Sequence, residues 1–294
     1  MNKDELKALV AQLLGELHQE PTVKAGDYKP TCHIEDATLP DITKINLRQQ
    51  YLVEQPKNPK AFLDLKAKTP ARLGVGKAGP RYRTSTLLRF RADHAAAQDS
   101  VFKVIGEDFA KEHGLIPLKT RCKDKDEYLT RPDLGRVFDE VNQKVIAGTW
   151  KGARVMIVIG DGLSSAAIEA NAIDCAAAIR QGLQAAGITI DKIPFIQFCR
   201  VGAGDHIGDL TGCELLCLLV GERPGLVTSE SMSAYITYRP HKGIPEAKRT
   251  VVSNIHSQGI PAVEAGAHIA ALMETMLKQK ASGLDLKQEL SHEG

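Results

Sequence analysis

Short apolar runs alternate with longer helical patterns over the second half of the chain. A long helical pattern at 165–186 is followed by Gly187, and a closing helical pattern covers 261–280. Strands alternating with helices favour an α/β fold with a parallel or mainly parallel sheet flanked by helices. The runs typical of buried strands are 154–159, 195–199, 214–220, 233–238 and 250–255.

The first half of the chain has a different pattern of apolar and polar residues. Apolar residues at helical spacing predict an amphipathic helix over residues 1–20, and 21–70 is interpreted as a linker or extended segment. Residues 71–150 are expected to be mostly helical and to precede a separate sheet domain over 151–294. The amphipathic helix is either a tethered tag or a helix that folds back on the body. Helices within 71–150 are predicted to begin at Thr84 or Ser85, at Asp99 or Ser100, and at Pro132.

Composition excludes several classes of function. The chain has 294 residues, 43% hydrophobic content, a net charge of +2 and 5% aromatic residues, which argues against a nucleic-acid partner. No apolar stretch approaches the roughly 20 residues of a membrane span, and no secretory signal is recognisable. Six cysteines without a Cys-x-x-Cys pair indicate buried, reduced thiols in a cytosolic protein and no metal site: Cys32, Cys122, Cys175, Cys199, Cys213 and Cys217.

A glycine pattern at Gly74, Gly76 and Gly79 matches the letters of a dinucleotide-binding fingerprint. Its context does not fit, because no apolar strand precedes it and Pro80 follows it directly. A flexible loop is the favoured interpretation.

Three other loops follow predicted strands, at Gly160–Ser165, Arg200–Gly202 and Gly221–Gly225. Because parallel strands end at one edge of a sheet, these loops are expected to converge on a binding rim that offers Asp161 and Glu222 as well as Arg200. His206 is either a ligand or a structural histidine, and we expect no catalytic group on this chain.

Several long and distinctive blocks occur in order between residues 70 and 285, among them "YLTRPDLGR", "GDGLSSAAI", "LLVGERPGL" and "SNIHSQGIPAVEAGAHI". These blocks carry a resemblance to the small (light) subunit family of ethanolamine ammonia-lyase. The resemblance implies a Rossmann-like domain that binds adenosylcobalamin against a large subunit holding ethanolamine. The cofactor's radical chemistry would yield acetaldehyde and ammonia.

The resemblance also implies positions for the cofactor contacts. Val201 and Glu222 match the family pattern, and a third contact falls on Val251, where relatives can carry Cys. Arg200 is added as a neighbour of Val201. The chain lacks Asp-x-His-x-x-Gly, so the benzimidazole of the cofactor is expected to stay on cobalt, with no protein metal ligand.

The same resemblance suggests a higher-order hetero-oligomer in the bacterial cytoplasm, inside an ethanolamine-utilisation microcompartment whose shell the helix over 1–20 would contact. The Gly- and Arg-rich loops within residues 72–91 favour contact of the segment 71–150 with the partner subunit. Two alternatives remain open: a stand-alone nucleotide-binding α/β enzyme and a non-enzymatic microcompartment adaptor.

Overall fold

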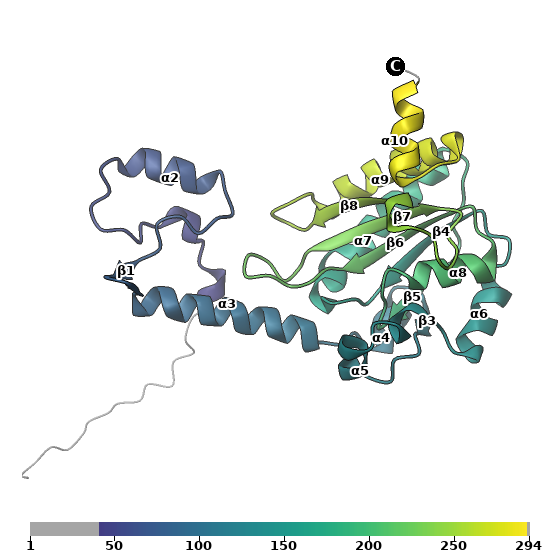
Figure 1. Ribbon diagram of the computed structural model, residues 1–294, viewed down its shortest axis with the longest axis horizontal. Helices are drawn as coiled ribbons and strands as arrows, with labels where there is room; N and C mark the ends of the chain where they lie inside the picture. Colours follow the sequence, from purple (N-terminus) through teal and green to yellow (C-terminus); the bar gives the residue numbers. More distant parts are fainter. Residues whose placement is uncertain (1–40, 293–294) are drawn as a thin grey trace, which may run out of the picture. The chain divides into compact units, whose positions relative to one another are not determined.

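A six-stranded sheet with helices packed around it is the main element of the fold (Figure 1). The computed structural model describes residues 41–292, and from Ile42 onward the described chain is one compact unit. The strand order is β3-β5-β4-β6-β7-β8. The strands are β3 (Ile116–Lys119), β4 (Val155–Gly160), β5 (Pro194–Gln197), β6 (Leu215–Gly221), β7 (Met232–Tyr238) and β8 (Arg249–Ile255).

The predicted α/β class is confirmed, with a mixed sheet. Strands β3, β5, β4 and β6 run parallel to one another. Strands β7 and β8 are antiparallel to their neighbours. The five predicted strands therefore all form, and the last two run in alternating directions.

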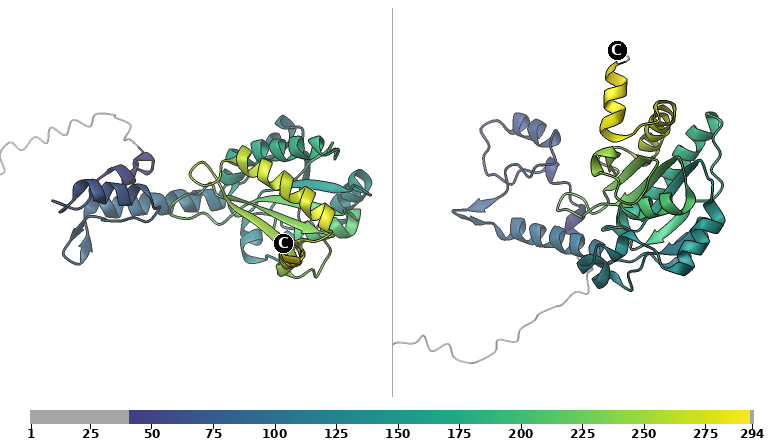
Figure 2. Two further views of the ribbon diagram at one scale, coloured as in Figure 1. Left: turned by 90° about the horizontal axis from the view of Figure 1, so that it is seen from above. Right: turned by 45° about the vertical axis from the view of Figure 1, so that its right-hand side comes forward.

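Both faces of the central strands are buried, as their continuous apolar sequence requires. On one face, Ile157 and Cys217 pack in a cluster with α7 (Ser165–Ala185) and α9 (Ala262–Gln279). On the other, Met156 and Leu218 pack in a second cluster with α6 (Glu140–Trp150) and α8 (Ala203–Thr211). The ribbon views of Figure 2 show helices lying against the sheet. The helices thus hold the sheet from two sides.

The segment 71–150 differs in detail from its predicted pattern. Helix α3 (Thr84–Phe102) begins at Thr84, but it passes through Asp99 and Ser100, and α4 (Glu107–Glu112) follows separately. The predicted start at Pro132 is wrong, because the side chain of Asp139 caps α6 by accepting a hydrogen bond from the Asn142 amide at 2.8 Å. The remaining elements are α5 (Lys125–Thr130) and a 3-10 turn at Leu134–Arg136.

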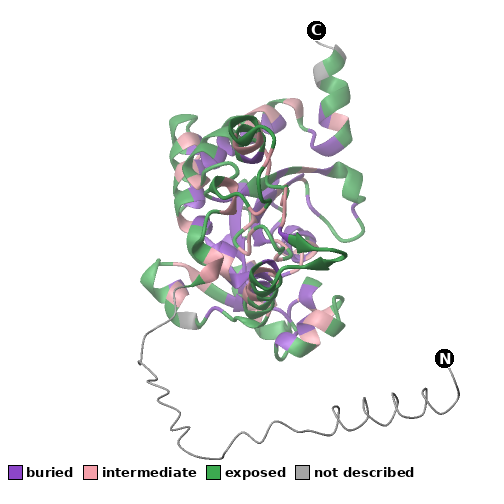
Figure 3. Ribbon diagram, turned by 90° about the vertical axis from the view of Figure 1, so that its left-hand side faces the viewer, coloured by how far each residue is buried: buried purple, intermediate pink, exposed green. Residues whose placement is uncertain are grey.

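Three strands also arise from this segment. Strand β3 joins the edge of the central sheet, so the sheet uses chain on both sides of the boundary predicted at residue 150. Strands β1 (Lys77–Ala78) and β2 (Arg81–Tyr82) form a small exposed hairpin, drawn as a green arrow in Figure 3.

Further helices lie near the two ends of the described chain. Helix α2 (Pro59–Ala67) falls in the segment predicted to be extended, and the Asn58 side chain caps it by accepting from the Ala61 amide at 3.1 Å. Short 3-10 turns cover Ile42–Lys44, Leu47–Gln49 and Glu246–Lys248. Helix α10 (Gly283–His292) follows α9 and was not predicted. The helix predicted over 1–20 lies outside the described residues.

Within residues 41–292, no helix is long and apolar enough to cross a membrane.

Candidate functional site

The loops after β4, β5 and β6 start at one edge of the sheet. Gly160 at the end of β4 is in register with Ile196 of β5 and with Val220 of β6. The Asp161 amide donates to the Ile196 carbonyl at 2.8 Å, and the Leu163 amide donates to the Gly221 carbonyl at 3.0 Å. The predicted convergence of these loops is therefore present.

Two glycines let the loops after β4 and β6 touch. A Cβ atom at Gly162 would lie 2.6 Å from the Gly221 carbonyl oxygen, and one at Gly221 would lie 2.0 Å from the Ser164 carbonyl oxygen. Both distances are far below van der Waals contact. Glycine at these positions serves the close approach of two backbones to each other.

Asp161 supports this edge from inside, and its predicted place on the rim is wrong. Its side chain is 0% exposed. One carboxylate oxygen accepts from the Ser165 hydroxyl at 2.7 Å and the other accepts from the Ile105 amide at 3.3 Å. Burial raises the pKa of the Asp161 carboxyl, and the nearby Lys125 ammonium partly opposes that rise. Asp161 therefore organises the loop and offers nothing to a ligand at the surface.

The crevice between β4 and β5 is filled by the chain itself. The loop after β4 leads to α7 on one face and the loop after β5 leads to α8 on the other, an arrangement that opens a ligand crevice in many sheets. Here the Tyr128 hydroxyl donates to the Cys199 carbonyl at 3.1 Å, and the Gly135 carbonyl accepts from the Arg200 amide at 2.9 Å.

Arg200 and Val201 lie beside the contacts that Tyr128 and Gly135 make with the loop after β5. The Arg200 guanidinium stacks 4.1 Å above the Tyr128 ring centre and donates to the Tyr128 carbonyl at 2.7 Å. Its Nε has no hydrogen-bond partner among the described residues. Val201 is half-buried against the apolar cluster under α8, just before that helix begins.

Glu222, Tyr235 and Val251 form a surface on the same side of the sheet, which we call the β6–β8 surface. The Tyr235 hydroxyl donates to the Glu222 carboxylate at 2.7 Å. Tyr235 of β7 is in register with Val251 of β8, so both side chains lie on one face. Glu222 and Tyr235 are half-buried, and Val251 is 46% exposed. The structure thus links two of the predicted residues through a tyrosine that the sequence analysis missed.

A signal for Tyr235 was present in the sequence. Along β7, Met232, Ala234 and Ile236 belong to the cluster under α9, and Tyr235 alternates with them. Such a period of two marks a strand whose second face is partly open.

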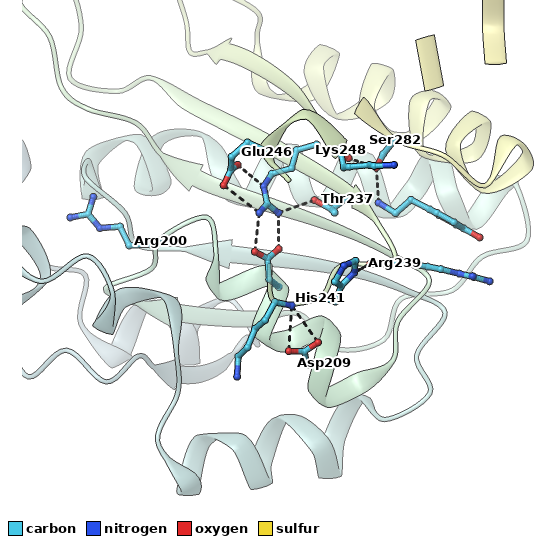
Figure 4. A network of polar contacts seen from close by, with 12 residues as sticks. Arg200, Asp209, Thr237, Arg239, His241, Glu246, Lys248 and Ser282 are labelled. Carbon is cyan, nitrogen blue, oxygen red and sulfur yellow. Dashed lines mark hydrogen bonds and ion pairs between the residues drawn. The ribbon is translucent and has the colours of Figure 1, made fainter. Parts of the chain in front are cut away.

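An ion network centred on the buried side chain of Arg249 lies next to the β6–β8 surface. Arg249 donates to both carboxylate oxygens of Asp205, at 2.6 and 2.8 Å, and to Glu246 at 2.7 Å. Figure 4 shows Glu246 and Thr237 on either side of this guanidinium. Burial by itself lowers the pKa of Arg249, but the hydrogen bonds and charges of the two carboxylates outweigh it and raise the pKa overall. The network therefore ties β8 to α8 through a guanidinium that stays charged.

Comparison with known proteins identifies the family. The family profile described as "Ethanolamine ammonia-lyase light chain (EutC)" matches residues 59–287. The chain belongs to the ethanolamine ammonia-lyase light chain family. It is 57% identical to the ethanolamine ammonia-lyase small subunit of Clostridioides difficile (strain 630), over 98% of this chain and 100% of the relative. The identity is 54% to the small subunits of Listeria monocytogenes serotype 4b (strain CLIP80459) and of Clostridium perfringens (strain ATCC 13124), with the same coverage.

In this member of the light chain family, His206 has a structural role. The side chain is buried, and its Nδ1 accepts a hydrogen bond from the Phe138 amide at 3.2 Å. Burial lowers the pKa of the imidazole, so the neutral form is favoured. Across residues 41–292, no group of three or more His, Cys, Asp or Glu side chains is placed to hold a metal ion.

The remaining sequence motifs of this light chain also have structural roles. The stretch from Gly74 to Gly79, interpreted as a flexible loop, contains strand β1 and the start of the turn to β2. The five cysteines in the described part of the chain are free and buried: Cys122, Cys175, Cys199, Cys213 and Cys217.

Proposed function

We propose that this chain is the small subunit of an ethanolamine ammonia-lyase and that it works with a large subunit to convert ethanolamine to acetaldehyde and ammonia. Membership of the light chain family over residues 59–287 carries this proposal. The β6–β8 surface at the edge of the sheet is partly exposed, with Val251 at 46%. A surface of that kind suits half of a binding site, with the substrate site on the large subunit.

The proposed cofactor is adenosylcobalamin, bound by a Rossmann-like domain that comprises the predicted range 151–294 together with strand β3. Val201, Glu222 and Val251, with Arg200 beside them, are the proposed contacts. The residues fit a large, flat, amide-rimmed ligand, since valine side chains pack against a ring and Glu222 accepts hydrogen bonds. Two buried polar atoms near this edge, Arg200 Nε and Ser233 Oγ, lack a partner among the described residues, as expected next to a polar ligand or its waters.

When bound, adenosylcobalamin supplies homolytic radical chemistry that no side chain provides. The role of this chain's own residues is to bind and orient the cofactor and to shield it from water. Asp161, Gly162 and Gly221 support that role by fixing the loops that carry the contacts.

The proposed coordination keeps the benzimidazole of the cofactor on cobalt. His206 is the histidine nearest in sequence to the loop after β5, and its Nδ1 is already used by the Phe138 amide. Electron paramagnetic resonance of the assembled enzyme containing histidine labelled with ¹⁵N in the ring tests this point. We expect no change in the nitrogen splitting; a change would show a histidine on cobalt.

Residues 71–150 are proposed to contact the large subunit, chiefly through the stretch 72–91. Large apolar side chains are exposed there, Leu88 at 52%. The Arg72 guanidinium donates to the Leu226 carbonyl, so this stretch adjoins the loop that follows Glu222. A partner covering the exposed residues would also reach the cofactor surface. The other exposed members of the set are Leu73, Tyr82 and Leu87.

We further propose a higher-order hetero-oligomer in the bacterial cytoplasm, packed in a microcompartment through the residues 1–20. The amphipathic pattern of those residues is the support for this assignment.

Reconstitution tests the proposed function. The chain alone, the large subunit alone and the mixture each receive adenosylcobalamin and ethanolamine, and acetaldehyde and the cobalt–carbon absorption are followed. We expect product only from the mixture. Activity of the chain alone would favour a self-sufficient enzyme, and full activity of the large subunit alone would favour an adaptor.

A further inference from the structure

We propose that Tyr235 is a further cofactor-binding residue, which together with Glu222 presents hydrogen-bond acceptors to an N–H or O–H donor of the cofactor. The inference rests on the proposed function, because it concerns the same surface. It adds a residue and states which chemical groups of the ligand face it.

The hydrogen bond between the two side chains determines what each has left to offer. A phenol has one proton, and that of Tyr235 is donated to Glu222 Oε1 at 2.7 Å. The phenol oxygen therefore keeps lone pairs that only accept. Glu222 Oε2 makes no hydrogen bond within the described part of the chain, and an ionised carboxylate also only accepts. The pair is thus a group of acceptors without a free donor.

The position of Tyr235 gives a ligand access to this pair. On one side it is in register with Leu218, a core residue of β6, and on the other with Val251, which is 46% exposed. Its ring is partly buried against the cluster under α8, so the hydroxyl is held in a fixed direction. The surface therefore runs continuously from an anchored ring to an open valine.

The protonation state of Tyr235 supports the same assignment. Burial, and then the hydrogen bond to Glu222 and its charge, raise the pKa of the phenol. The hydroxyl keeps its proton at neutral pH and remains the donor to Glu222.

Ligand chemistry follows from an acceptor pair of this kind. Primary amides on the rim of the corrin and the ribose hydroxyl of the nucleotide tail are donors, and they match it. A phosphate oxygen does not match, because it would face a carboxylate with no donor between them. The surface therefore faces an amide or a hydroxyl of the cofactor and excludes its phosphate.

Matched tyrosine variants test the inference in the complex with the large subunit. Tyr235→Phe removes one hydroxyl and keeps the ring. Tyr238→Phe is the control, because Tyr238 lies on the same strand and donates to Glu214 at 3.3 Å, away from the β6–β8 surface. Cyanocobalamin binding is measured by equilibrium dialysis, and Tyr235→Phe is expected to weaken it about tenfold while Tyr238→Phe leaves it unchanged.

A second variant tests whether Tyr235 and Glu222 act as a pair. Glu222→Gln leaves Tyr235 in place, and the double variant with Tyr235→Phe should lose less affinity than the two single losses combined, since the residues act as a pair. Unchanged binding by Tyr235→Phe, with normal binding by the unmodified complex, overturns the inference and leaves the proposed function intact. An unmodified complex that binds no cyanocobalamin overturns the proposed function, and the inference with it.

Discussion

Arg249 and Asp205 form a bidentate ion pair between strand β8 and helix α8. Their atoms are 2.6 and 2.8 Å apart, and the side chains are only 4% and 10% exposed. Val251 lies two residues beyond Arg249, and Val201 lies four residues before Asp205. The ion pair therefore fixes the distance between two elements that carry proposed cofactor contacts.

Removing the charge of Asp205 should destabilise the fold. Asp205→Asn leaves the buried Arg249 with Glu246 as its only carboxylate, and we expect the free energy of unfolding to fall by about 3 kcal/mol. Urea unfolding of the full-length chain followed by circular dichroism measures it. Glu169→Gln is the control, because it breaks an exposed ion pair with Lys103 and should cost about 1 kcal/mol or less. Equal losses in the two variants would contradict the structural role of the buried pair.

The contact between the loops after β4 and β6 should not tolerate a methyl group at Gly221. In Gly221→Ala the added Cβ would overlap the Ser164 backbone, so the loop carrying Glu222 must move. We expect a loss of about 2 kcal/mol or more in stability, together with weaker cyanocobalamin binding by the complex.

Gly148→Ala is the matched control for this substitution. Gly148 is exposed in α6 and has open space around its Cβ position, so alanine should stabilise the helix by about 0.5–1 kcal/mol. Normal cofactor binding by Gly221→Ala would show that the loop contact does not position Glu222.

A charge at position 251 should affect binding more than folding. Val251→Asp places a carboxylate on an exposed edge strand, so stability should change by about 1 kcal/mol or less. Cyanocobalamin affinity of the complex should fall at least about tenfold, because the charge would be desolvated under the ligand. Val263→Asp, in the first turn of α9 and 60% exposed, should leave affinity unchanged. Equal affinities in both variants would remove Val251 from the contact set.

Much of the fold was predictable because short, continuous apolar runs such as that of β6, bounded by turn residues, favour buried strands. Strand β3 was missed because Ile116–Lys119 is short and contains Pro117, which an edge strand tolerates. The antiparallel direction of β7 could also have been predicted from the length of the connection before it. The connection 222–231 is shorter than the dozen or so residues that a parallel crossover needs.

The candidate site was less predictable because it depends on register. Nothing local in the sequence indicates that Tyr235 donates to Glu222, since that contact follows from the pairing of β6 with β7. Nor does it indicate that Tyr128 and Gly135 fill the crevice beside Arg200. The burial of Asp161 likewise follows from residues 100–105 packing over the loop, a contact between distant parts of the chain.

Stability should fall on the acidic side of neutrality because His206 is buried. Its pKa lies below the ordinary value of 6.5, so the unfolded chain takes up a proton at a pH where the folded chain does not. The contribution of His206 is complete above about pH 6.5 and is lost as the pH falls toward the folded-state pKa. His206→Asn keeps an acceptor for the Phe138 amide and removes the titration.

The midpoints of urea unfolding, measured between pH 8 and pH 5, test whether stability falls with pH in this direction. The wild type should lose stability relative to His206→Asn as the pH falls. The raised pKa of Asp161 acts in the opposite direction, but it is present in both proteins and cancels in the comparison. Parallel curves over the whole range would contradict the assignment.

The residues 1–20 should be dispensable for catalysis and required for packaging. Deleting them removes the amphipathic pattern of Leu6, Leu9 and Leu13 while leaving the described residues untouched. We expect unchanged acetaldehyde formation by the complex and loss of its co-purification with microcompartment shells. Replacing Leu9 and Leu13 by Asp should reproduce the deletion, and replacing Lys3 and Lys7 by Gln should not, because only the apolar face would bind the shell. Loss of activity on deletion would instead show a helix that supports the enzyme itself.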